Sequence, residues 1–392
     1  MIVNPRSFYY PEYQPTRNRK EQSVLRRISV AIVAATVAFS WPLFACAADD
    51  TGADLEQLKE ILERAADYLK SHQGKDGSFS PRFAGPGITA VVVAGMLRCG
   101  FRVDDPVVAR GLGYLEKSVK PDGGIYDKRL ANYTTSVAVM ALQEANKDGK
   151  YDAIIKNATA YLKRLQHSLE EEDFKFGGVG YDDKSRPDLS NTQYFIDALI
   201  AAGVSKDDPA IKRAMKFVSR CQNLPGETND RPFAKKTTED DKGGLVYVPD
   251  PGDKPHQTPE GGLRSLGAMT YGGLRSFLYA GVSKDDPRVK GAVGWIRRHY
   301  TLDENPGMGQ AGLFYYYHTF GKAMAALGED RFEDAKGQKH DWRRELFEAL
   351  KKRQQENGSF INKGDRQFGE ADPNLATGFA LLALSYTRTT KK

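Results

Sequence analysis

Two kinds of helix-like segment alternate along residues 54–386, and they differ in how their apolar positions are arranged. One kind ends in an aromatic–apolar pair that is followed, in its clear copies, by three residues and then Gln. The other kind is rich in small and apolar residues on nearly every side, as in residues 134–142 and 377–384. A helix that is apolar all round must be buried on most faces. We therefore predict that the second kind forms inner helices and the first kind outer helices.

An outer segment, a Gly-centred turn and an inner segment form one unit, and six such units follow one another. The clear copies of the outer pattern are Tyr68-Leu69…Gln73, Tyr161-Leu162…Gln166 and Phe217-Val218…Gln222, and the degenerate copies are Tyr114-Leu115…Val119, Trp295-Ile296…Tyr300 and Ala349-Leu350…Gln354. The turns are centred on Gly77, Gly123, Gly177, Gly243, Gly312 and Gly358. Repetition of this kind indicates a repeat architecture.

Acidic pairs recur in front of the outer segments. Residues 203–209 and 281–287 are the identical sequence Gly-Val-Ser-Lys-Asp-Asp-Pro, and residues 103–106 are a shorter copy. Gly ends a helix, Asp caps the next helix, and Pro is favoured at the first helical position. We interpret these carboxylates as helix caps rather than as metal-binding or catalytic groups.

Six hairpins can bury all their inner helices only if they close into a ring. The sequence therefore predicts an all-α fold, an α6/α6 toroid of twelve helices, and no alternating strand pattern opposes it. The outer-to-inner connections are long in units three, four and five, and the longest is residues 223–262. Because all six connections lie at one end of the ring, they predict an uneven rim around a central cavity. The longest loop is either a lid or a solvated charged loop.

The first 47 residues have the order of a secretory signal peptide. Residues 1–27 hold six basic and two acidic residues, residues 28–39 are an apolar run, and Ala45-Cys46-Ala47 follows. We expect export to the periplasm or the extracellular space, with an uncleaved anchor or a lipoprotein acylated at Cys46 as alternatives. Residues 48–53 are interpreted as a linker and residues 387–392 as a polar tail.

Composition supports one packed domain and removes a hint of nucleic-acid binding. The 392 residues are 40% hydrophobic and 28% charged, which is typical of a globular protein. The net charge of +6 is concentrated in residues 1–47, which carry four of these charges and leave two for the rest. The net charge of +2 that remains on residues 48–392 does not indicate a nucleic-acid partner. The pair Cys99 and Cys221 could form a disulfide in an oxidising compartment.

The unit Tyr68-Leu69…Gln73…Gly77-Ser78-Phe79 resembles the repeat of the terpene cyclase and protein prenyltransferase superfamily. Gln354…Gly358-Ser359-Phe360 matches it equally well, and both have Phe where the squalene-cyclase repeat has Trp. The resemblance covers about residues 54–386. It implies an α/α toroid whose central cavity, in related enzymes, holds an isoprenoid chain.

The catalytic motifs of that superfamily are absent from the sequence. Squalene-type cyclases protonate an alkene with an Asp-x-Asp-Asp motif, and the closest segments here are 239–241 and 182–183. Prenyltransferases hold zinc with Asp, Cys and a distant His, which Asp188 and His318 resemble, but Ser190 replaces the Cys. A serine hydroxyl is a poor substitute for a thiolate ligand. We expect no metal and no cofactor.

Polar and aromatic residues at the predicted starts of the inner helices would face the cavity mouth. Aromatic rings with a few convergent polar groups suit an apolar ligand or a sugar ring. The ligand-binding candidates are Tyr133, Asn191, Gln193, Tyr194, Tyr271, Tyr315, Tyr317 and Asp372. Asp188 and His318 are the candidates for an acid–base pair.

The sequence supports three hypotheses for function. The first is an exported, monomeric protein that binds an isoprenoid, another lipid or a glycan in its cavity without the standard cyclase or transferase chemistry. The alternative is a lyase or cyclase that uses Asp188, His318 or the tyrosines as non-standard acid and base. The third is an interaction module whose uneven rim contacts another protein of the cell envelope.

Overall fold

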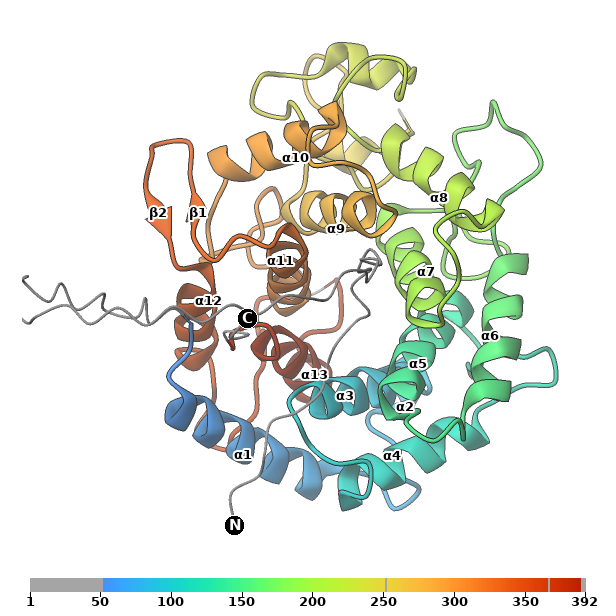
Figure 1. The fold of residues 1–392 in the computed structure, drawn as a ribbon, viewed down its shortest axis with the longest axis vertical. Coiled ribbons are helices and arrows are strands. Elements are labelled where there is room, and N and C mark those ends of the chain that lie inside the picture. The colour runs from blue at the N-terminus through green and yellow to red at the C-terminus, as the bar shows by residue number, and fades with distance from the viewer. Residues whose placement is uncertain (1–51, 251, 366, 389–392) are drawn as a thin grey trace, which may run out of the picture. The chain divides into compact units, whose positions relative to one another are not determined.

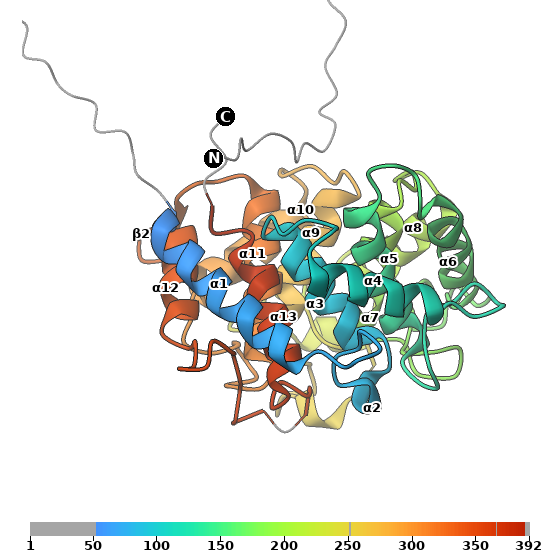
Figure 2. The same ribbon diagram turned by 90° about the horizontal axis from the view of Figure 1, so that it is seen from below.

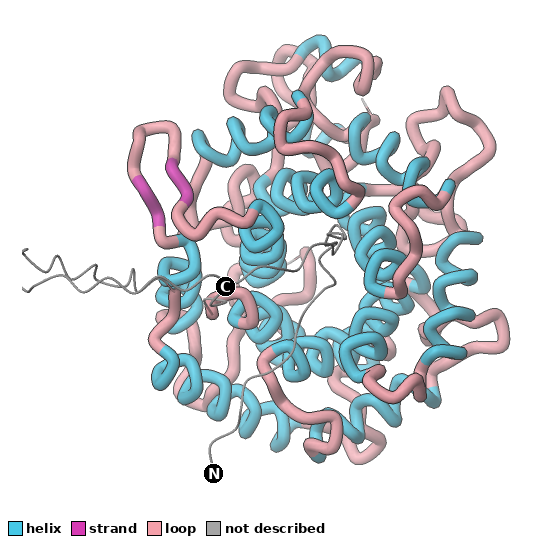
Figure 3. Tube along the Cα trace, in the orientation of Figure 1, coloured by secondary structure: helices cyan, strands magenta, loops and turns pink. Residues whose placement is uncertain are grey.

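The computed structural model describes residues 52–250, 252–365 and 367–388. The predicted signal peptide in residues 1–47, including Cys46, lies outside these residues. Within them, helices alternate along the chain between an outer and an inner ring, as Figure 1 and the tube in Figure 3 show. The predicted α6/α6 toroid is confirmed.

Six helices form each ring. The outer helices are α1 (Leu55–His72), α4 (Pro106–Lys117), α6 (Asp152–Arg164), α8 (Pro209–Arg220), α10 (Pro287–Arg298) and α12 (Trp342–Lys351). The inner helices are α3 (Gly87–Arg98), α5 (Ala131–Ala145), α7 (Leu189–Ala201), α9 (Gly267–Tyr279), α11 (Leu313–Leu327) and α13 (Pro373–Leu384). The connections add α2 (Pro81–Ala84) and the 3₁₀ turns η1 (Pro232–Lys236) and η2 (Lys254–His256).

The inner ring closes where the first inner helix meets the last. Each inner helix contacts the next one along the chain, and α13 contacts α3. Two glycines permit this approach, because a Cβ added at Gly95 would lie 2.9 Å from the Leu381 Cβ, and one at Gly378 would lie 2.9 Å from a Val91 methyl. Small residues in the inner segments therefore set the helix spacing at this joint.

The repeated Gln and Gly hold neighbouring outer helices together. The Gln73 Nε2 donates to the carbonyl of Gly77 at 3.0 Å and to that of Val107, in the first turn of the next outer helix, at 2.9 Å. Gly77 has φ +93°, and a Cβ there would lie 2.2 Å from the Arg110 carbonyl oxygen. Equivalent pairs of bonds are made by Gln166, Gln222 and Gln354, the last reaching back to α1.

A repeated threonine, which the sequence interpretation overlooked, fixes the turn against the inner helix in units one, two, three, four and six. The Thr89 hydroxyl accepts a hydrogen bond from the Phe79 amide, just after the Gly turn, at 2.9 Å. The same bond is made by Thr135, Thr192, Thr270 and Thr377. Because each threonine is buried, the bond satisfies an amide that would otherwise lose its partner.

The capping interpretation of the acidic pairs is confirmed. Asp105, Asp208 and Asp286 each accept hydrogen bonds from backbone amides in the first turn of an outer helix, whose first residue is Pro. The turn assigned to unit five was wrong. Gly312 is the residue immediately before α11, with φ +64°, so it begins the inner helix and does not follow the outer one.

Two further features differ from the sequence picture. A two-stranded antiparallel hairpin, β1 (Phe332–Glu333) and β2 (Lys339–His340), lies between α11 and α12, although no strand was predicted. Two-residue strands carry too little alternation for a sequence pattern to reveal them. Cys99 and Cys221 are both buried free thiols, so the disulfide considered from the sequence is not formed.

Candidate functional site

A cavity of about 710 Å³ opens where the inner helices begin. Figure 2 shows outer-to-inner connections, including α2, gathered at one end of the ring, as predicted. All six inner helices contribute to the lining, together with their connections. The polar part of the lining consists of Tyr133, Tyr181, Ser190, Tyr194, Tyr247, His256, Asn305, Tyr315, Gln367 and Glu370, and the apolar part includes Ile88, Met269, Met308, Ala311, Leu375 and Phe379.

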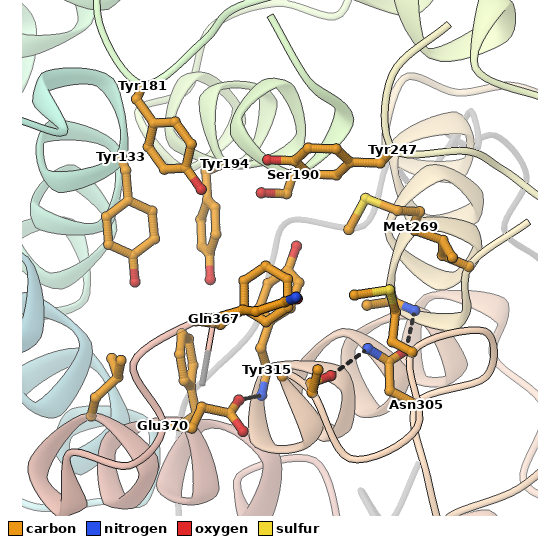
Figure 4. A pocket seen from close by; sticks show the side chains of 18 of the residues that line it. Tyr133, Tyr181, Ser190, Tyr194, Tyr247, Met269, Asn305, Tyr315, Gln367 and Glu370 are labelled. Atoms are coloured by element: carbon orange, nitrogen blue, oxygen red, sulfur yellow. Dashed lines mark hydrogen bonds between the residues drawn. The ribbon is translucent and has the colours of Figure 1, made fainter. Parts of the chain in front are cut away.

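Five tyrosines dominate the polar part of the lining. Tyr133 and Tyr194 pack edge to face with ring centroids 5.0 Å apart, and the Tyr315 ring lies 6.0 Å from that of Tyr194. Figure 4 shows the hydroxyls of these three pointing toward the middle of the cavity. Burial raises the pKa of all five, Tyr181 and Tyr247 included, so their hydroxyls stay protonated at neutral pH.

The hydroxyls of Tyr315 and Tyr194 differ in their hydrogen-bond partners. The Gln193 amide donates to the Tyr315 hydroxyl oxygen at 2.9 Å, which leaves the Tyr315 proton to point elsewhere. The Tyr194 hydroxyl is buried and has no hydrogen-bond partner among the described residues. Buried polar groups in native proteins are usually hydrogen-bonded, so a partner for Tyr194 within the cavity is expected.

Two carboxyl groups lie at the ends of inner helices beside the tyrosines. Asp188 caps α7 by accepting hydrogen bonds from the Asn191 amide and side chain, both at 2.8 Å. Glu370 lines the cavity and accepts from the amides of Phe314 at 3.1 Å and Tyr315 at 2.7 Å, at the start of α11 (Figure 4). Burial raises the pKa of Asp188 to about 6 and that of Glu370 to about 7.

The structure brings only part of the predicted site together. Tyr133, Tyr194 and Tyr315 line the cavity. Asn191 and Gln193 lie just behind this lining as partners of Asp188 and Tyr315. The other candidates have structural contacts away from it: Tyr271 packs in the core against Tyr316 and Phe320, the Tyr317 hydroxyl donates to the Leu302 carbonyl, and Asp372 caps α13.

The predicted pairing of Asp188 with His318 is not formed. His318 lies farther along α11, outside the cavity lining, with its ring stacked near Phe379 and Tyr386 at centroid distances of 6.1 and 6.4 Å. Burial, with the charge of Lys322, lowers the pKa of His318 well below its usual value, so the imidazole is neutral. Helix spacing accounts for this, because residue 318 is one turn beyond Tyr315, on the same face but deeper in the ring.

A buried ion cluster, which the sequence interpretation missed, fills the ring beyond His318. The Asp197 carboxylate on α7 contacts both Arg275 on α9 and Lys322 on α11. Nearby, Arg98 on α3 pairs with Glu144 on α5 at 2.9 Å. Asp197, Arg275 and Lys322 lie in the C-terminal halves of their inner helices, whereas the cavity opens where these helices begin.

The cavity residues that the sequence interpretation missed fall into two groups. Tyr181 and Tyr247 each stand four residues after a turn glycine, at Gly177 and Gly243, so the repeat alignment could have found them. Glu370, Ser190 and His256 occupy positions with no equivalent in the other units. No pattern in one sequence distinguishes such residues from ordinary loop residues.

The described residues contain no cluster of metal-ligating side chains. The Asp188 and His318 segments that resemble a transferase zinc site stay apart, and no group of three or more His, Cys, Asp or Glu converges within the described ranges. None of the helices in the described part of the chain has the length and hydrophobicity that a membrane span requires.

Comparison with known proteins confirms the resemblance drawn from the repeats. Residues 82–238 match the family model of the squalene-hopene cyclase C-terminal domain. No curated protein matches the chain. Over these residues, which are less than half of the chain, it is similar to that family.

Several solved structures are similar to the chain at low identity. One is a variant of the type II terpene cyclase MstE from Scytonema in complex with its product merosterolic acid A, at 13% identity, 84% coverage of this chain, 97% of that chain and a TM-score of 0.43. Another is a wild-type glycosidase, at 12% identity, 86% and 99% coverage and a TM-score of 0.45. A third is a protein from Actinoplanes, at 13% identity, 85% and 100% coverage and a TM-score of 0.39. Likenesses at this level say nothing about chemistry.

Proposed function

We propose that the central cavity binds an uncharged isoprenoid or other lipid with a small polar end. The observation that carries this proposal is the lining itself, which combines apolar side chains with tyrosine hydroxyls and includes no Lys or Arg among the residues that the structure describes. Small-molecule sites of about 300–1,000 Å³ with a mostly apolar lining and a few placed polar groups are typical of such ligands. The cavity volume of about 710 Å³ lies within that range.

The charge of the lining favours a neutral ligand over a prenyl diphosphate or a fatty-acid anion. Phosphate and carboxylate groups are recognised by cationic side chains or by free backbone amides. Here the described lining residues include no Lys or Arg, and the Glu370 carboxyl already occupies the amides at the start of α11. An anionic head group would therefore exchange its hydration for hydroxyl donors without a Lys or Arg among those residues to balance its charge.

The hydrogen bonds of the lining favour a lipid over a glycan. Asn305 lines the cavity, but its oxygen accepts from the Ala268 amide at 3.1 Å and its nitrogen donates to the Ala311 carbonyl at 3.0 Å. Its amide is thus occupied by the protein backbone (Figure 4). A sugar needs many polar partners, whereas this lining supplies hydroxyl groups, the Gln367 amide and the His256 imidazole beside a larger apolar surface.

Native mass spectrometry of the protein isolated from its host, followed by lipid analysis, tests the proposal. A neutral lipid should copurify with the wild type and be lost from Ala311→Trp, which fills the cavity. The matched control is Ala109→Trp, an exposed position on outer helix α4, which should keep the lipid. Loss of lipid from both variants, or none in the wild type together with no binding of added farnesol, refutes the proposal.

The location of this activity is a separate part of the proposal. The order of basic, apolar and small residues in 1–47 supports export, so we place the binding function in the cell envelope or outside the cell. The N-terminal sequence of the protein recovered from its host decides between cleavage, an uncleaved anchor and acylation at Cys46. Cross-linking at the uneven rim around residues 223–262 tests for an envelope partner.

A second candidate is acid catalysis on a bound isoprenoid. It is favoured by Glu370, a carboxyl in the lining whose pKa burial raises to about 7, so that much of it is protonated at neutral pH. Its hydrogen bonds from two amides and from Asn362 already explain its position, which is why binding is placed first. Incubation of wild type and Glu370→Gln with squalene or farnesol, with product analysis, tests it: cyclised product only from the wild type supports catalysis.

A further inference from the structure

One histidine in the cavity wall is held by a buried carboxylate. The His256 Nδ1 lies 2.8 Å from the Asp253 Oδ2, and His256 lines the cavity. Asp253 is only 5% exposed, although it belongs to the long connection that precedes α9. This connection, residues 223–262, is therefore more than a solvated charged loop, because one of its side chains, that of His256, lines the cavity.

A cation lies beside the pair. The Arg186 guanidinium lies 3.8 Å from Asp253 and 3.5 Å from the neighbouring Asp250. The Tyr247 ring, itself part of the lining, lies 6.3 Å from the imidazole. A carboxylate can only accept hydrogen bonds, so the proton of the Asp253–His256 bond belongs to Nδ1.

This hydrogen bond fixes the chemistry of the other ring nitrogen. In a neutral imidazole with its proton on Nδ1, Nε2 has a lone pair and accepts hydrogen bonds. Because burial raises the pKa values of Tyr133, Tyr194 and Tyr315, their hydroxyls stay protonated, and each can donate as well as accept a hydrogen bond. The Nε2 of His256 adds a ring nitrogen that only accepts.

We propose that the His256–Asp253 pair supplies a hydrogen-bond acceptor to this cavity and that it receives the hydroxyl group of an alcohol ligand. The proposal rests on the proposed function, because it specifies the polar end of the lipid. The ligand O–H donates to Nε2, while a tyrosine hydroxyl can donate to the ligand oxygen. The proton stays on the ligand oxygen, so no covalent bond forms or breaks.

The position of this pair distinguishes it from other histidine–carboxylate contacts among the described residues. His299 lies 3.4 Å from Asp240 and His340 lies 2.9 Å from Glu345, but neither lines the cavity. His299 therefore serves as a matched control, since it has the same kind of contact on the outer surface of the ring.

A pair of probes that differ by one donor tests the proposal. Farnesol and farnesyl methyl ether have the same chain, but only farnesol can donate a hydrogen bond. For the full chain, we expect farnesol to bind about three- to tenfold more tightly, the effect of one hydrogen bond. In His256→Leu and Asp253→Ala this preference should fall to about twofold or less, with the affinity for the ether unchanged, whereas His299→Leu should keep it.

The outcomes separate this proposal from the proposed function. Equal binding of both probes by the wild type overturns the role of His256 and leaves lipid binding intact. Binding of neither probe refutes lipid binding and, with it, this proposal. A preference that survives in His256→Leu overturns it as well.

The tautomer of His256 provides a test that needs no ligand. In protein labelled with ¹⁵N-histidine, the resonance lost in His256→Leu identifies this ring. We expect its neutral form to be protonated at Nδ1 in the wild type and to move toward the Nε2-protonated form in Asp253→Ala. A wild-type ring protonated at Nε2 would overturn the proposal whatever the binding result.

Discussion

In the buried ion cluster, we expect that replacing the carboxylate lowers the stability of the protein more than replacing one of the cations. Asp197, Arg275 and Lys322 are 3%, 5% and 6% exposed, so water can replace none of their contacts. Asp197→Asn leaves two cations without a carboxylate, and breaking a buried pair in this way costs about 3–5 kcal/mol. Lys322→Met leaves Asp197 paired with Arg275, so we expect a change within about 1.5 kcal/mol.

The cost of Asp197→Asn has an independent upper bound. The variant can relieve the repulsion if Lys322 gives up its proton, and burial together with the charge of Arg275 already lowers the pKa of Lys322 below 10.5. At pH 7, deprotonating a lysine with an ordinary pKa costs about 5 kcal/mol, which agrees with the range above. The folded variant then binds fewer protons than the unfolded chain, so its stability rises with pH by at most about 1.4 kcal/mol per unit up to the unfolded pKa.

Urea unfolding followed by circular dichroism measures both effects. We expect the free energy of unfolding of Asp197→Asn to be lower than that of the wild type by about 3–5 kcal/mol at pH 7, with a smaller gap at pH 9. Lys322→Met should stay within about 1.5 kcal/mol of the wild type at pH 7. Equal losses in the two variants, or a gap that does not narrow with pH, would refute the reasoning.

Three further predictions concern the repeat and the cavity. Gly177→Ala places a Cβ 1.9 Å from the Arg213 carbonyl oxygen at φ +83°, and should cost several times more stability in thermal unfolding than Gly203→Ala, where φ is +77° and nothing lies within 4 Å. Thr192→Val removes the acceptor of the Val179 amide and should lower the free energy of unfolding by about 1–3 kcal/mol, whereas an unchanged value would show that the bond is dispensable. The raised pKa of Glu370, about 7, means that the folded state binds more protons than the unfolded state from roughly pH 4.5 to 7, so wild-type stability should fall with pH across that window. Glu370→Gln should flatten this part of the profile, and an unaltered slope would contradict the assignment.

The sequence predicted the architecture well because the repeated positions report on backbone geometry. Gln73 and Gly77 recur since one makes two bonds to backbone carbonyls and the other touches a carbonyl of the next outer helix. The hydrogen bonds of the Gln and the close backbone contact of the Gly are the same in each unit that has these residues, so the repeated pattern shows them in the sequence. Unit five breaks the pattern, with Tyr300 at the Gln position, and there the assigned turn was wrong.

The site was less predictable because function depends on what makes the units differ. Tyr133, Tyr194 and Tyr315 were found since they stand at the starts of inner helices, a place that the repeat defines. His256 and Glu370 come from irregular connections, whose path is set by contacts such as that of Arg186 with Asp253. Contacts of this kind join residues that are far apart along the chain, and no pattern in a single sequence predicts them.

Closure of the inner ring makes the cavity a late product of synthesis. The helix α3 is complete after residue 98, yet the helix that packs on its open side, α13, begins at Pro373. Until then the apolar flank of α3, including Gly95, faces no neighbour of its own chain. The Gln354 side chain donates to the Ile61 carbonyl at 2.9 Å, and this hydrogen bond also cannot form until the end of the chain is synthesised. A nascent chain that lacks the last hairpin therefore exposes an apolar, aggregation-prone helix flank and has an incomplete cavity. Synthesis and packing of the sixth unit bury this flank and complete the binding site.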